Sequence, residues 1–387
     1  MAPEIAIVGG GPAGLALAAI LEKNNIDYIV YERSSEQSQP RGGCLDLHVG
    51  SGQRAMHEAG VYDEFKKNSR DGDATIHLLY DHQGNKLLAF GEGRDAPEID
   101  RWQLRNVLLT GIPKHKIIWS KPVASSHRNE EGQIVLTFTD GTTASGFNLV
   151  VGADGTNSKI RHLVTDAKPV YSGNLYITTK IHPGNPYYST LESIGGVGSH
   201  VIMGNGKHMF NSRQGDGHYR IDVGLHKPEN FPATAGINFD DHEAVKNLLL
   251  KDEYFGCYAP ELKDIIRHSE GPFRPWLMYH MPTNKLNWSA SKDVTLIGDA
   301  AHVTTPFVGD GVNCALRDSC ILAGKLKEFG LTKRAIAEYE KEMLPYAIDV
   351  ISRSILSGVQ FFEDDAPKSF LATMTSARPL IGASDGH

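Results

Sequence analysis

The start of the chain combines short apolar runs with an amphipathic stretch. Residues 4–8 and 27–31 are apolar runs of strand length, and each predicts a buried strand. Between them, over residues 13–24, apolar side chains recur at helical spacing: Leu15, Leu17, Ala18 and Leu21. A strand, a helix and a second strand in this order predict a βαβ unit within a parallel sheet.

The buried-strand pattern occurs twice more, and other patterns fill the remainder of the chain. Residues 149–153 and 293–297 are further apolar runs, and an aspartate follows each of them closely. Residues 169–283 alternate apolar and polar positions between Gly and Asn turns, which predicts a mostly antiparallel sheet. Residues 335–362 have helical spacing, and Pro345 predicts a kink or a break in that helix.

These patterns predict an α/β protein with more than one domain. The 387 residues are enough for two domains that share an interface. We expect a discontinuous first domain over residues 1–168 and 284–340, and a sheet domain over residues 169–283. Residues 341–387 are expected to form a C-terminal helix, which bridges both domains, and a tail.

Composition and charge argue against several classes of partner. The net charge of -7 comes without a basic block, which argues against nucleic acid and against a membrane surface. Neither a secretory signal nor an apolar run of about 20 residues is visible. The four cysteines form no Cys-x-x-Cys pair, which is typical of reduced thiols in the cytosol. We expect a cytoplasmic monomer without a metal site.

The turn after the first strand has the spacing of a dinucleotide-binding loop. Gly9, Gly11 and Gly14 form Gly-x-Gly-x-x-Gly, with Pro12 and Ala13 before the last glycine. The first glycine permits the tight turn, the second lets a pyrophosphate approach the backbone, and the third lets the helix pack on the strand. The alternative is a glycine-rich turn that binds nothing.

The second strand ends on an acidic residue, as a nucleotide site requires. Glu32, followed by Arg33, is placed where a carboxylate can accept hydrogen bonds from both hydroxyls of an adenosine ribose. A carboxylate there disfavours a 2′-phosphate, so this unit is not an NADPH site. The βαβ unit alone does not separate FAD from NAD.

Two later motifs each place an aspartate after a buried strand. Residues 152–161 form Gly-Ala-Asp-Gly-x-x-Ser-x-x-Arg, which includes Asp154, and a helix is expected near Ser158. Residues 298–302 form Gly-Asp-Ala-Ala-His, which presents Asp299. A Pro/Gly loop and a helix from about Asn313 then follow. The last loop residues are Gly309, Asp310, Gly311 and Val312.

With these three motifs in this order, the chain resembles the group A flavoprotein monooxygenases, which have the para-hydroxybenzoate hydroxylase fold. The resemblance covers roughly residues 4–345. It implies that residues 1–168 and 284–340 form a Rossmann-like FAD-binding domain. It also implies that residues 169–283 bind the substrate.

The segments 41–48 and 98–105 resemble a narrower group within this family, the tetracycline-inactivating monooxygenases. This resemblance implies that FAD is held by Asp46, Arg105, Asp299 and the loop of residues 309–312. It also implies that Arg41 lies near NADPH.

The likeness is weaker at the positions that would contact a substrate. Thr178 stands where the resemblance predicts glutamine, and Asp222 stands where it predicts histidine. Ser199, with His200 beside it, stands where arginine is expected. Three apolar positions do match: Phe210, Pro306 and Phe307. The resemblance therefore implies a bulky polycyclic or aromatic substrate. Tetracycline-type antibiotics are among the candidates.

The resemblance also implies the reaction. NADPH or NADH reduces FAD, O2 adds to give a 4a-hydroperoxyflavin, and the substrate is hydroxylated. The flavin supplies the chemistry, so we expect no protein nucleophile. We expect Asp299 and Gly311 to position the flavin. The alternatives are a reductase on the same fold and a flavoprotein that sequesters a ligand. A halogenase would need Trp-x-Trp-x-Ile-Pro, which the sequence lacks.

Two histidines lie within these segments, and each has a structural alternative. His302 could be a base at the flavin site, but a structural hydrogen bond after the strand is the preferred interpretation. His48 could touch the nicotinamide or could only support its loop.

Overall fold

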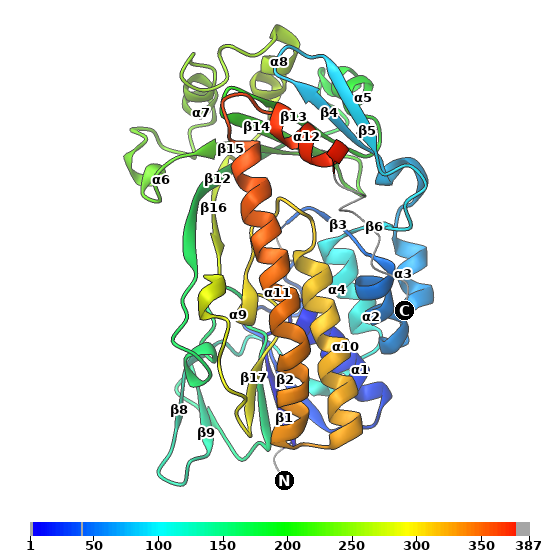
Figure 1. Ribbon diagram of the computed structural model, residues 1–387, viewed down its shortest axis with the longest axis vertical. Helices are drawn as coiled ribbons and strands as arrows, with labels where there is room; N and C mark the ends of the chain where they lie inside the picture. Colours follow the sequence, from blue (N-terminus) through cyan, green and yellow to red (C-terminus); the bar gives the residue numbers. More distant parts are fainter. Residues whose placement is uncertain (1–2, 40–41, 377–387) are drawn as a thin grey trace.

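The computed structural model describes residues 3–39 and 42–376. Two sheets organise the molecule, one with five parallel strands and one with seven mostly antiparallel strands (Figure 1). Helix α11 (Lys333–Phe361) runs along both parts. The predicted fold class is confirmed, since a Rossmann-like α/β region is combined with an antiparallel sheet. Arg41 lies outside the described residues.

The parallel sheet is built from the predicted apolar runs. In the order β17-β11-β1-β2-β7, its strands are Val294–Leu296, Leu149–Gly152, Ile5–Val8, Tyr28–Tyr31 and Ile117–Ile118. The three strands β17, β11 and β1 are buried along their full length, as expected of a parallel sheet with both faces covered. Their carboxyl ends therefore lie at one edge, where the three predicted motifs begin.

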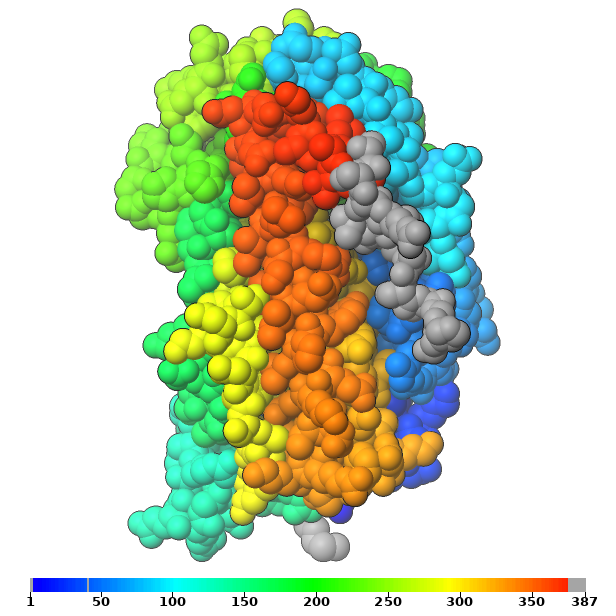
Figure 2. Space-filling view, in the orientation of Figure 1, coloured from blue at the N-terminus to red at the C-terminus, as the bar shows by residue number. Residues whose placement is uncertain are grey.

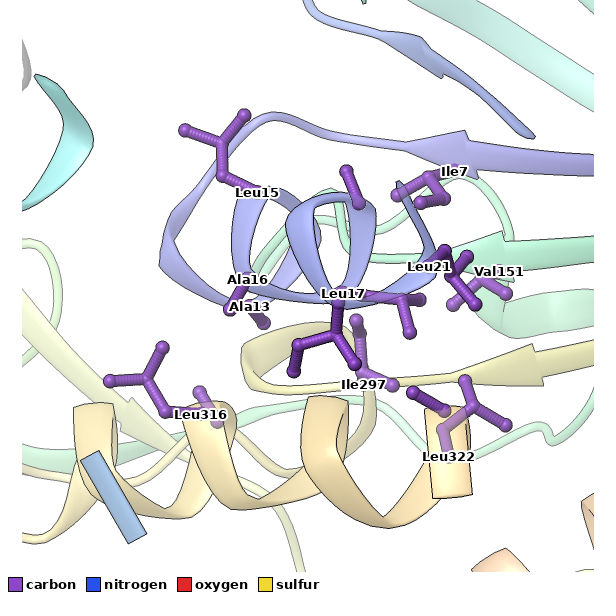
Figure 3. Close-up of a cluster of buried hydrophobic side chains, with 14 of the residues drawn as sticks. Ile7, Ala13, Leu15, Ala16, Leu17, Leu21, Val151, Ile297, Leu316 and Leu322 are labelled. Atoms are coloured by element: carbon purple, nitrogen blue, oxygen red, sulfur yellow. The ribbon is translucent and has the colours of Figure 1, made fainter. Parts of the chain in front are cut away.

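Helix α1 (Pro12–Lys23) packs its apolar side against this sheet and against helix α10 (Gly311–Phe329). Figure 3 shows Leu17 and Leu21 of α1 beside Val151 and Ile297, with Leu316 of α10 opposite. All residues of α1 from Ala13 to Leu21 are buried, so the helix is enclosed on every side and the helical spacing found in the sequence marks only part of its buried surface.

The larger sheet has the strand order β16-β12-β15-β14-β13-β4-β5. Its strands are Arg274–His280, Val170–Ile181, Tyr219–His226, Lys207–Arg213, Ser199–Gly204, His77–Asp81 and Lys86–Phe90. Only β13 and β4 pair in parallel; the other neighbours are antiparallel. Residues 77–90 thus join this sheet although we expected them in the first domain. Local patterning could not reveal this, because strands distant in sequence form the β13–β4 pair.

The two faces of the larger sheet have different neighbours. Helices α7 (His242–Leu249) and α8 (Pro260–His268) pack against one face. The other face joins a cluster that includes Phe307 and Phe361. Because alternate residues of a strand point to opposite faces, each side chain can be assigned to one neighbour or the other.

Helix α11 continues through Pro345 without a break, so of the two predicted outcomes, a kink or a break, the break is wrong. Met343 and Ala347 are buried on either side of Pro345 and pack in the core with α10. This packing offsets the lost backbone hydrogen bond. Figure 2 shows α11 as a continuous ridge along the molecule. The expected domain limit at residue 340 falls within this helix, and the domain limits themselves stay a prediction.

Shorter elements complete the described chain. The helices are α2 (Arg54–Ala59), α3 (Tyr62–Asn68), α4 (Arg101–Leu109), α5 (Tyr188–Gly195), α6 (Phe231–Thr234), α9 (Asp299–His302) and α12 (Lys368–Ser376). The strands are β3 (Cys44–Asp46), β6 (Glu98–Asp100), β8 (Val123–Arg128), β9 (Ile134–Phe138) and β10 (Thr143–Ala144). No helix in this part of the chain is both long and apolar enough to cross a membrane.

The helix expected near Ser158 is wrong. The chain forms only a single 3-10 turn there, Arg161–Leu163. The hydroxyl of Ser158 accepts hydrogen bonds from the backbone N–H groups of Ile160 and Arg161, both at 3.1 Å. These local bonds stabilise a turn in place of a helix.

Candidate functional site

The glycine turn leaves open space at the N-terminus of α1. Gly9 has φ +113°, and a Cβ there would lie 2.3 Å from the carbonyl oxygen of Ala153. A Cβ on Gly14 would lie 2.0 Å from the carbonyl oxygen of Gly9. Around a Cβ on Gly11, in contrast, no atom lies within 4 Å. Gly9 and Gly14 are thus required for packing, whereas Gly11 keeps room for a ligand at the helix N-terminus.

Glu32 lies beside this turn. One of its carboxylate oxygens accepts a hydrogen bond from the N–H of Gly10 at 2.6 Å, and the other accepts from Ser34 at 2.8 Å. Arg33 is exposed. Arg105 donates to the carbonyl of Glu36 at 3.0 Å and stacks over Trp119 at 4.7 Å. The structure therefore places the predicted ribose acceptor next to the predicted phosphate-binding loop.

Arg161 joins the second motif to the third. Its buried guanidinium donates to the carbonyls of Thr156, Asp299 and Ala300 at 2.8, 3.0 and 2.7 Å. Asp154 accepts from the N–H of Lys159 at 2.6 Å. Its other carboxylate oxygen is buried without a hydrogen-bond partner in the described chain. Two loops far apart in sequence are thus fixed in one geometry.

Asp299 lies where these loops meet. The side chain reaches solvent, yet enough protein surrounds it that desolvation raises the pKa of its carboxyl group. Positive charge on His302, Arg101 and Arg161 opposes this rise, as does a hydrogen bond from Thr156. Such an accessible carboxylate can accept hydrogen bonds from a hydroxylated ligand.

A second group of charged side chains surrounds the loop of residues 309–312. His48 lies 3.1 Å from Asp46 through Nε2 and 3.3 Å from Asp310 through Nδ1. Arg94 donates to Asp46 at 2.7 Å, and Arg353 of α11 donates to Asp310 at 2.9 Å. Asp310 is therefore buried in an ion pair. No motif or spacing in the sequence pointed to Arg94 or Arg353.

These contacts change the proton affinities of the group. Burial disfavours the charged form of His48, but the hydrogen bonds that it donates to Asp310 and Asp46 outweigh burial and raise its pKa to about 9. Burial also opposes the charge of Asp46, yet His48 and Arg94 lower its pKa to about 2. At neutral pH the imidazolium thus links two carboxylates. His48 supports its loop, as one of our two interpretations held.

Helix α10 begins at Gly311, two residues before the predicted start, and Asn313 in its first turn holds the facing loop. The Asn313 side chain accepts from the N–H groups of His48 and Gly52 at 2.9 and 3.2 Å, and donates to the carbonyl of Asp46 at 2.9 Å. His302 is buried and lies 2.5 Å from Asp318. This confirms the structural interpretation of His302.

Thr178 and Asp222 are paired across β12 and β15, on the sheet face that points away from α7 and α8. The hydroxyl of Thr178 donates to Asp222 at 2.5 Å. Arg220, which the sequence analysis missed, donates to both oxygens of Asp222 at 2.7 and 2.9 Å. The three side chains form one hydrogen-bonded group, in which Asp222 is buried and Thr178 and Arg220 are partly exposed.

The structure does not place His200 with them. His200 is fully buried on the opposite face, where its Nε2 lies 3.0 Å from the side chain of Asn211. Strand alternation explains the error, because Ser199 and not His200 shares a face with Phe210 and Asp222. Burial lowers the pKa of His200 to about 3, so it is neutral.

The apolar residues of the predicted substrate site do gather. Phe307 and Phe210 belong to one cluster with Tyr176 of β12 and Phe361 of α11. The ring of Phe307 lies 6.4 Å from Tyr176 and 5.3 Å from Phe361. Pro306 is exposed beside it. Aromatic side chains from both parts of the molecule thus form a wall next to the polar group of Thr178, Asp222 and Arg220.

The family that matches the chain accounts for this arrangement. Its description is "FAD binding domain", and it matches residues 3–176 and 265–354. The chain belongs to the FAD binding domain family. The matched segments contain the three motifs and omit most of the predicted substrate domain.

Individual relatives of this FAD-binding chain support the same assignment. Monooxygenase penA of Penicillium thymicola is 30% identical over 381 residues, which are 87% of this chain and 88% of that protein. HpxO of Klebsiella pneumoniae, complexed with FAD and uric acid, has a TM-score of 0.76 at 20% identity and covers 96% and 92% of the two chains. Tetracycline destructase Tet(51) has a TM-score of 0.69 at 22% identity and covers 96% and 95%. The resemblance to group A flavoprotein monooxygenases is confirmed.

The geometry fits the cofactor of this FAD-binding family. Open space at Gly11 and the buried, unpartnered carboxylate oxygen of Asp154 both suit a ligand that brings phosphates and hydroxyls. Arg101 provides a third indication, because its Nε is buried without a hydrogen-bond partner among the described residues. The sequence analysis did not single out Arg101 as a site residue, because only the fold brings its positive charge near Asp299.

Proposed function

We propose that the protein is an FAD-dependent monooxygenase that uses NADPH or NADH and O2 to hydroxylate a bulky polycyclic or aromatic substrate. The observation that supports this most strongly is the junction at Asp299. There, three nucleotide-binding motifs converge beside a sheet face with aromatic and polar side chains. In the overall reaction one oxygen atom enters the product, and the other leaves as water with the electrons of the nicotinamide.

Bound FAD would supply the oxygen chemistry, and the chain would bind and orient it. We propose that Gly9, Gly11 and Gly14, with Pro12, Ala13, Glu32 and Arg33, hold the adenosine and pyrophosphate. We propose that Asp154, Asp299, Asp46, Arg105 and residues 309–312 hold the remainder. The N-terminus of α10 would favour negative charge near the flavin ring.

The substrate would lie between this loop and the sheet. Phe307 and Phe210 would contact its rings and exclude water, while Arg220 with Asp222 and Thr178 would contact a polar group. Tetracycline destructase Tet(51) has the same fold, but the polar groups here differ from those that the resemblance predicts. We therefore expect tetracyclines to bind with modest turnover, and another polycyclic compound to be the better substrate.

The test is an assay of the purified protein with NADPH, air and a panel of tetracyclines and polycyclic phenols. We expect a yellow protein that releases FAD on denaturation and a product heavier by one oxygen in the mass spectrum. NADPH oxidation without an oxygenated product would favour a reductase. Ligand binding without NADPH oxidation would favour a sequestering flavoprotein.

Substitution tests the proposed cofactor contacts. Asp299→Ala and Glu32→Ala each remove charge-assisted hydrogen bonds, worth roughly 1.5–3 kcal/mol apiece. Both variants should therefore retain less FAD, measured as the ratio of flavin to protein absorbance. Full flavin occupancy and turnover in both variants would contradict the assignment.

A further inference from the structure

The polar group on the face of the larger sheet is an ion pair with most of its donors and acceptors already satisfied. Arg220 donates to both carboxylate oxygens of Asp222, at 2.7 and 2.9 Å, and its Nη2 group also donates to the hydroxyl of Thr178 at 3.2 Å. The same hydroxyl donates to Asp222 at 2.5 Å. The guanidinium and the carboxylate are thus held in a bidentate geometry by a third side chain.

This ion pair is largely sheltered from water. The side chains of Arg220 and Asp222 are 17% and 6% exposed. Strand pairing places Asp222 directly opposite Phe210 of β14, and Thr178 lies two residues from Tyr176 on the same face of β12. Because water screens charges poorly in such surroundings, Asp222 cancels most of the positive charge that Arg220 would otherwise present at this face.

One donor of the ion pair remains for a ligand. The Nη1 group of Arg220 makes no hydrogen bond within the described chain, and it is not sealed from solvent. This N–H group can donate to the oxygen of a ring carbonyl or of a hydroxyl. A carboxylate ligand in the same place would also lie beside the carboxylate of Asp222, and the two negative charges would repel each other.

Other arginines around the proposed site are neutralised in the same way. Three of them have carboxylate partners at 2.9, 2.7 and 2.9 Å: Arg70 with Asp100, Arg94 with Asp46, and Arg353 with Asp310. Arg101 differs, because its Nε is buried without a hydrogen-bond partner among the described residues, but its charge acts on Asp299 in the proposed FAD site. These side chains therefore offer little positive charge to an anionic substrate.

We propose that the substrate is an uncharged polycyclic compound whose ring carbonyl or hydroxyl oxygen accepts a hydrogen bond from Nη1 of Arg220, and that Asp222 excludes rings that bear a carboxylate. This inference rests on the proposed function, which places the substrate against this sheet face. Phe210 and Phe307 would contact the rings, but apolar contacts discriminate weakly between an amide and an acid of the same shape. Selection by charge would therefore come from Asp222.

The test compares two ligands that have the same shape but a different charge. The probes are 2-naphthamide, which is neutral, and 2-naphthoate, which is an anion at about pH 7.5. Each probe is titrated by calorimetry into the oxidised, FAD-bound enzyme, so the measurement needs no turnover. The wild type should bind 2-naphthamide about tenfold more tightly than 2-naphthoate, or by a larger factor, because like charges side by side weaken binding.

Substitution of the carboxylate tests its role directly. Asp222→Asn keeps the size of the side chain and an acceptor for Arg220 but removes the negative charge, so the preference should shift about tenfold toward 2-naphthoate. Thr178→Val removes only the hydroxyl and should keep the preference of the wild type. Asp264→Asn is the matched control, because Asp264 pairs with Arg267 at 2.5 Å on α8, against the opposite face of the sheet. It should change neither Kd.

Three results would overturn the inference. The first is a wild type that binds 2-naphthoate as tightly as 2-naphthamide or that binds neither probe; this result needs no variant, so it counts even if Asp222→Asn does not fold. The second is an unchanged preference in Asp222→Asn that retains FAD. The third is an equal shift in Thr178→Val, which would show that packing and not charge sets the preference. Flavin content is measured first in each variant.

The inference and the proposed function can fail separately. The predicted preference for 2-naphthamide, without an oxygenated product from any compound of the panel, would refute the hydroxylase assignment alone. A wild-type enzyme that oxygenates a polycyclic compound but prefers 2-naphthoate would refute the inference alone.

Discussion

At the scale of single residues, the candidate site depends on side chains that each connect separate segments. Arg161 is one example, because its guanidinium reaches both the loop after β11 and the loop after β17. His48 is another, because it lies between Asp46 and Asp310. Their substitution should therefore affect loop geometry, and not only a single hydrogen bond.

Arg161→Lys should destabilise the fold and reduce FAD retention. A lysine keeps the charge but offers one compact ammonium in place of a planar fork, so it cannot satisfy carbonyls on both loops. Each lost bond from a charged donor should cost about 1.5–3 kcal/mol. The checks are denaturant unfolding and the flavin-to-protein absorbance ratio. The argument would fail if Arg161→Lys matched the wild type in both.

His48 should make stability depend on pH. Its pKa is raised to about 9, so its contribution is complete below about 6.5 and is lost as the pH rises through about 9. At about 1.4 kcal/mol per pH unit, the contribution is on the order of 3 kcal/mol at most. The charged groups that face it are Asp46, Asp310, Arg94 and Arg353.

The measurement compares the free energy of unfolding of the wild type and of His48→Gln from pH 6 to pH 10. Glutamine keeps a polar side chain but does not titrate, so other titrating groups cancel in the difference. The advantage of the wild type should shrink as the pH rises from about 6.5 to about 9. A difference that is constant with pH would show that His48 is not the titrating group.

At the scale of elements, the contact between β1 and α1 determines whether packing requires a given glycine of the turn that joins them. A Cβ on Gly14 would lie 2.0 Å from the backbone of Gly9, whereas a Cβ on Gly11 would meet no atom within 4 Å. The same motif thus contains one glycine that packing requires and one that only a ligand requires.

Gly14→Ala and Gly11→Ala should therefore differ. Gly14→Ala should lower the free energy of unfolding by about 1–3 kcal/mol or more, because the helix must move off the strand. Gly11→Ala should change it by less than about 1 kcal/mol but should weaken FAD binding, because the methyl group occupies the space of a pyrophosphate. Chemical denaturation of the FAD-free protein and FAD titration check the two parts. Equal stability losses would refute the distinction.

At the scale of the whole molecule, α11 connects the two sheets. Met343, Ala347 and Val350, in the middle of this helix, pack in the core of the parallel sheet. Its last turn brings Phe361 into the aromatic cluster with Phe307, on the other sheet's face. The relative position of the FAD-binding region and the proposed substrate face therefore depends on this helix.

Phe361→Ala should reduce stability by about 3–5 kcal/mol, since the side chain is only 7% exposed. Val359→Ala is a control on the same helix, because Val359 is 55% exposed and its truncation should have little effect. If the proposed function holds, Phe361→Ala should also release more hydrogen peroxide per NADPH, because water enters the aromatic cluster. If Phe361→Ala released no more hydrogen peroxide than Val359→Ala, Phe361 would have no role in excluding water.

The sequence alone determined the features that depend on local order along the chain. The strand–glycine–helix–acid series predicted the parallel sheet, because a strand, a helix and a second strand in that order form a βαβ unit. The close approach of Gly9 and Gly14 to the backbone agrees with the glycines in that series. The alternation over residues 169–283 predicted the antiparallel sheet, and Asp154 and Asp299 were found because each follows a buried strand. These signals come from residues close to one another in the sequence, so they can be detected without knowledge of tertiary contacts.

Only the tertiary structure decided which distant residues meet. Arg101, Arg220 and Arg353 were missed because a charged residue gains a role only from the partner that the fold brings to it. His200 was misplaced because a single-residue change along a strand reverses the face to which a side chain points. The pairing of β4 with β13 and the continuity of α11 through Pro345 depend on long-range packing, which outweighs local preference.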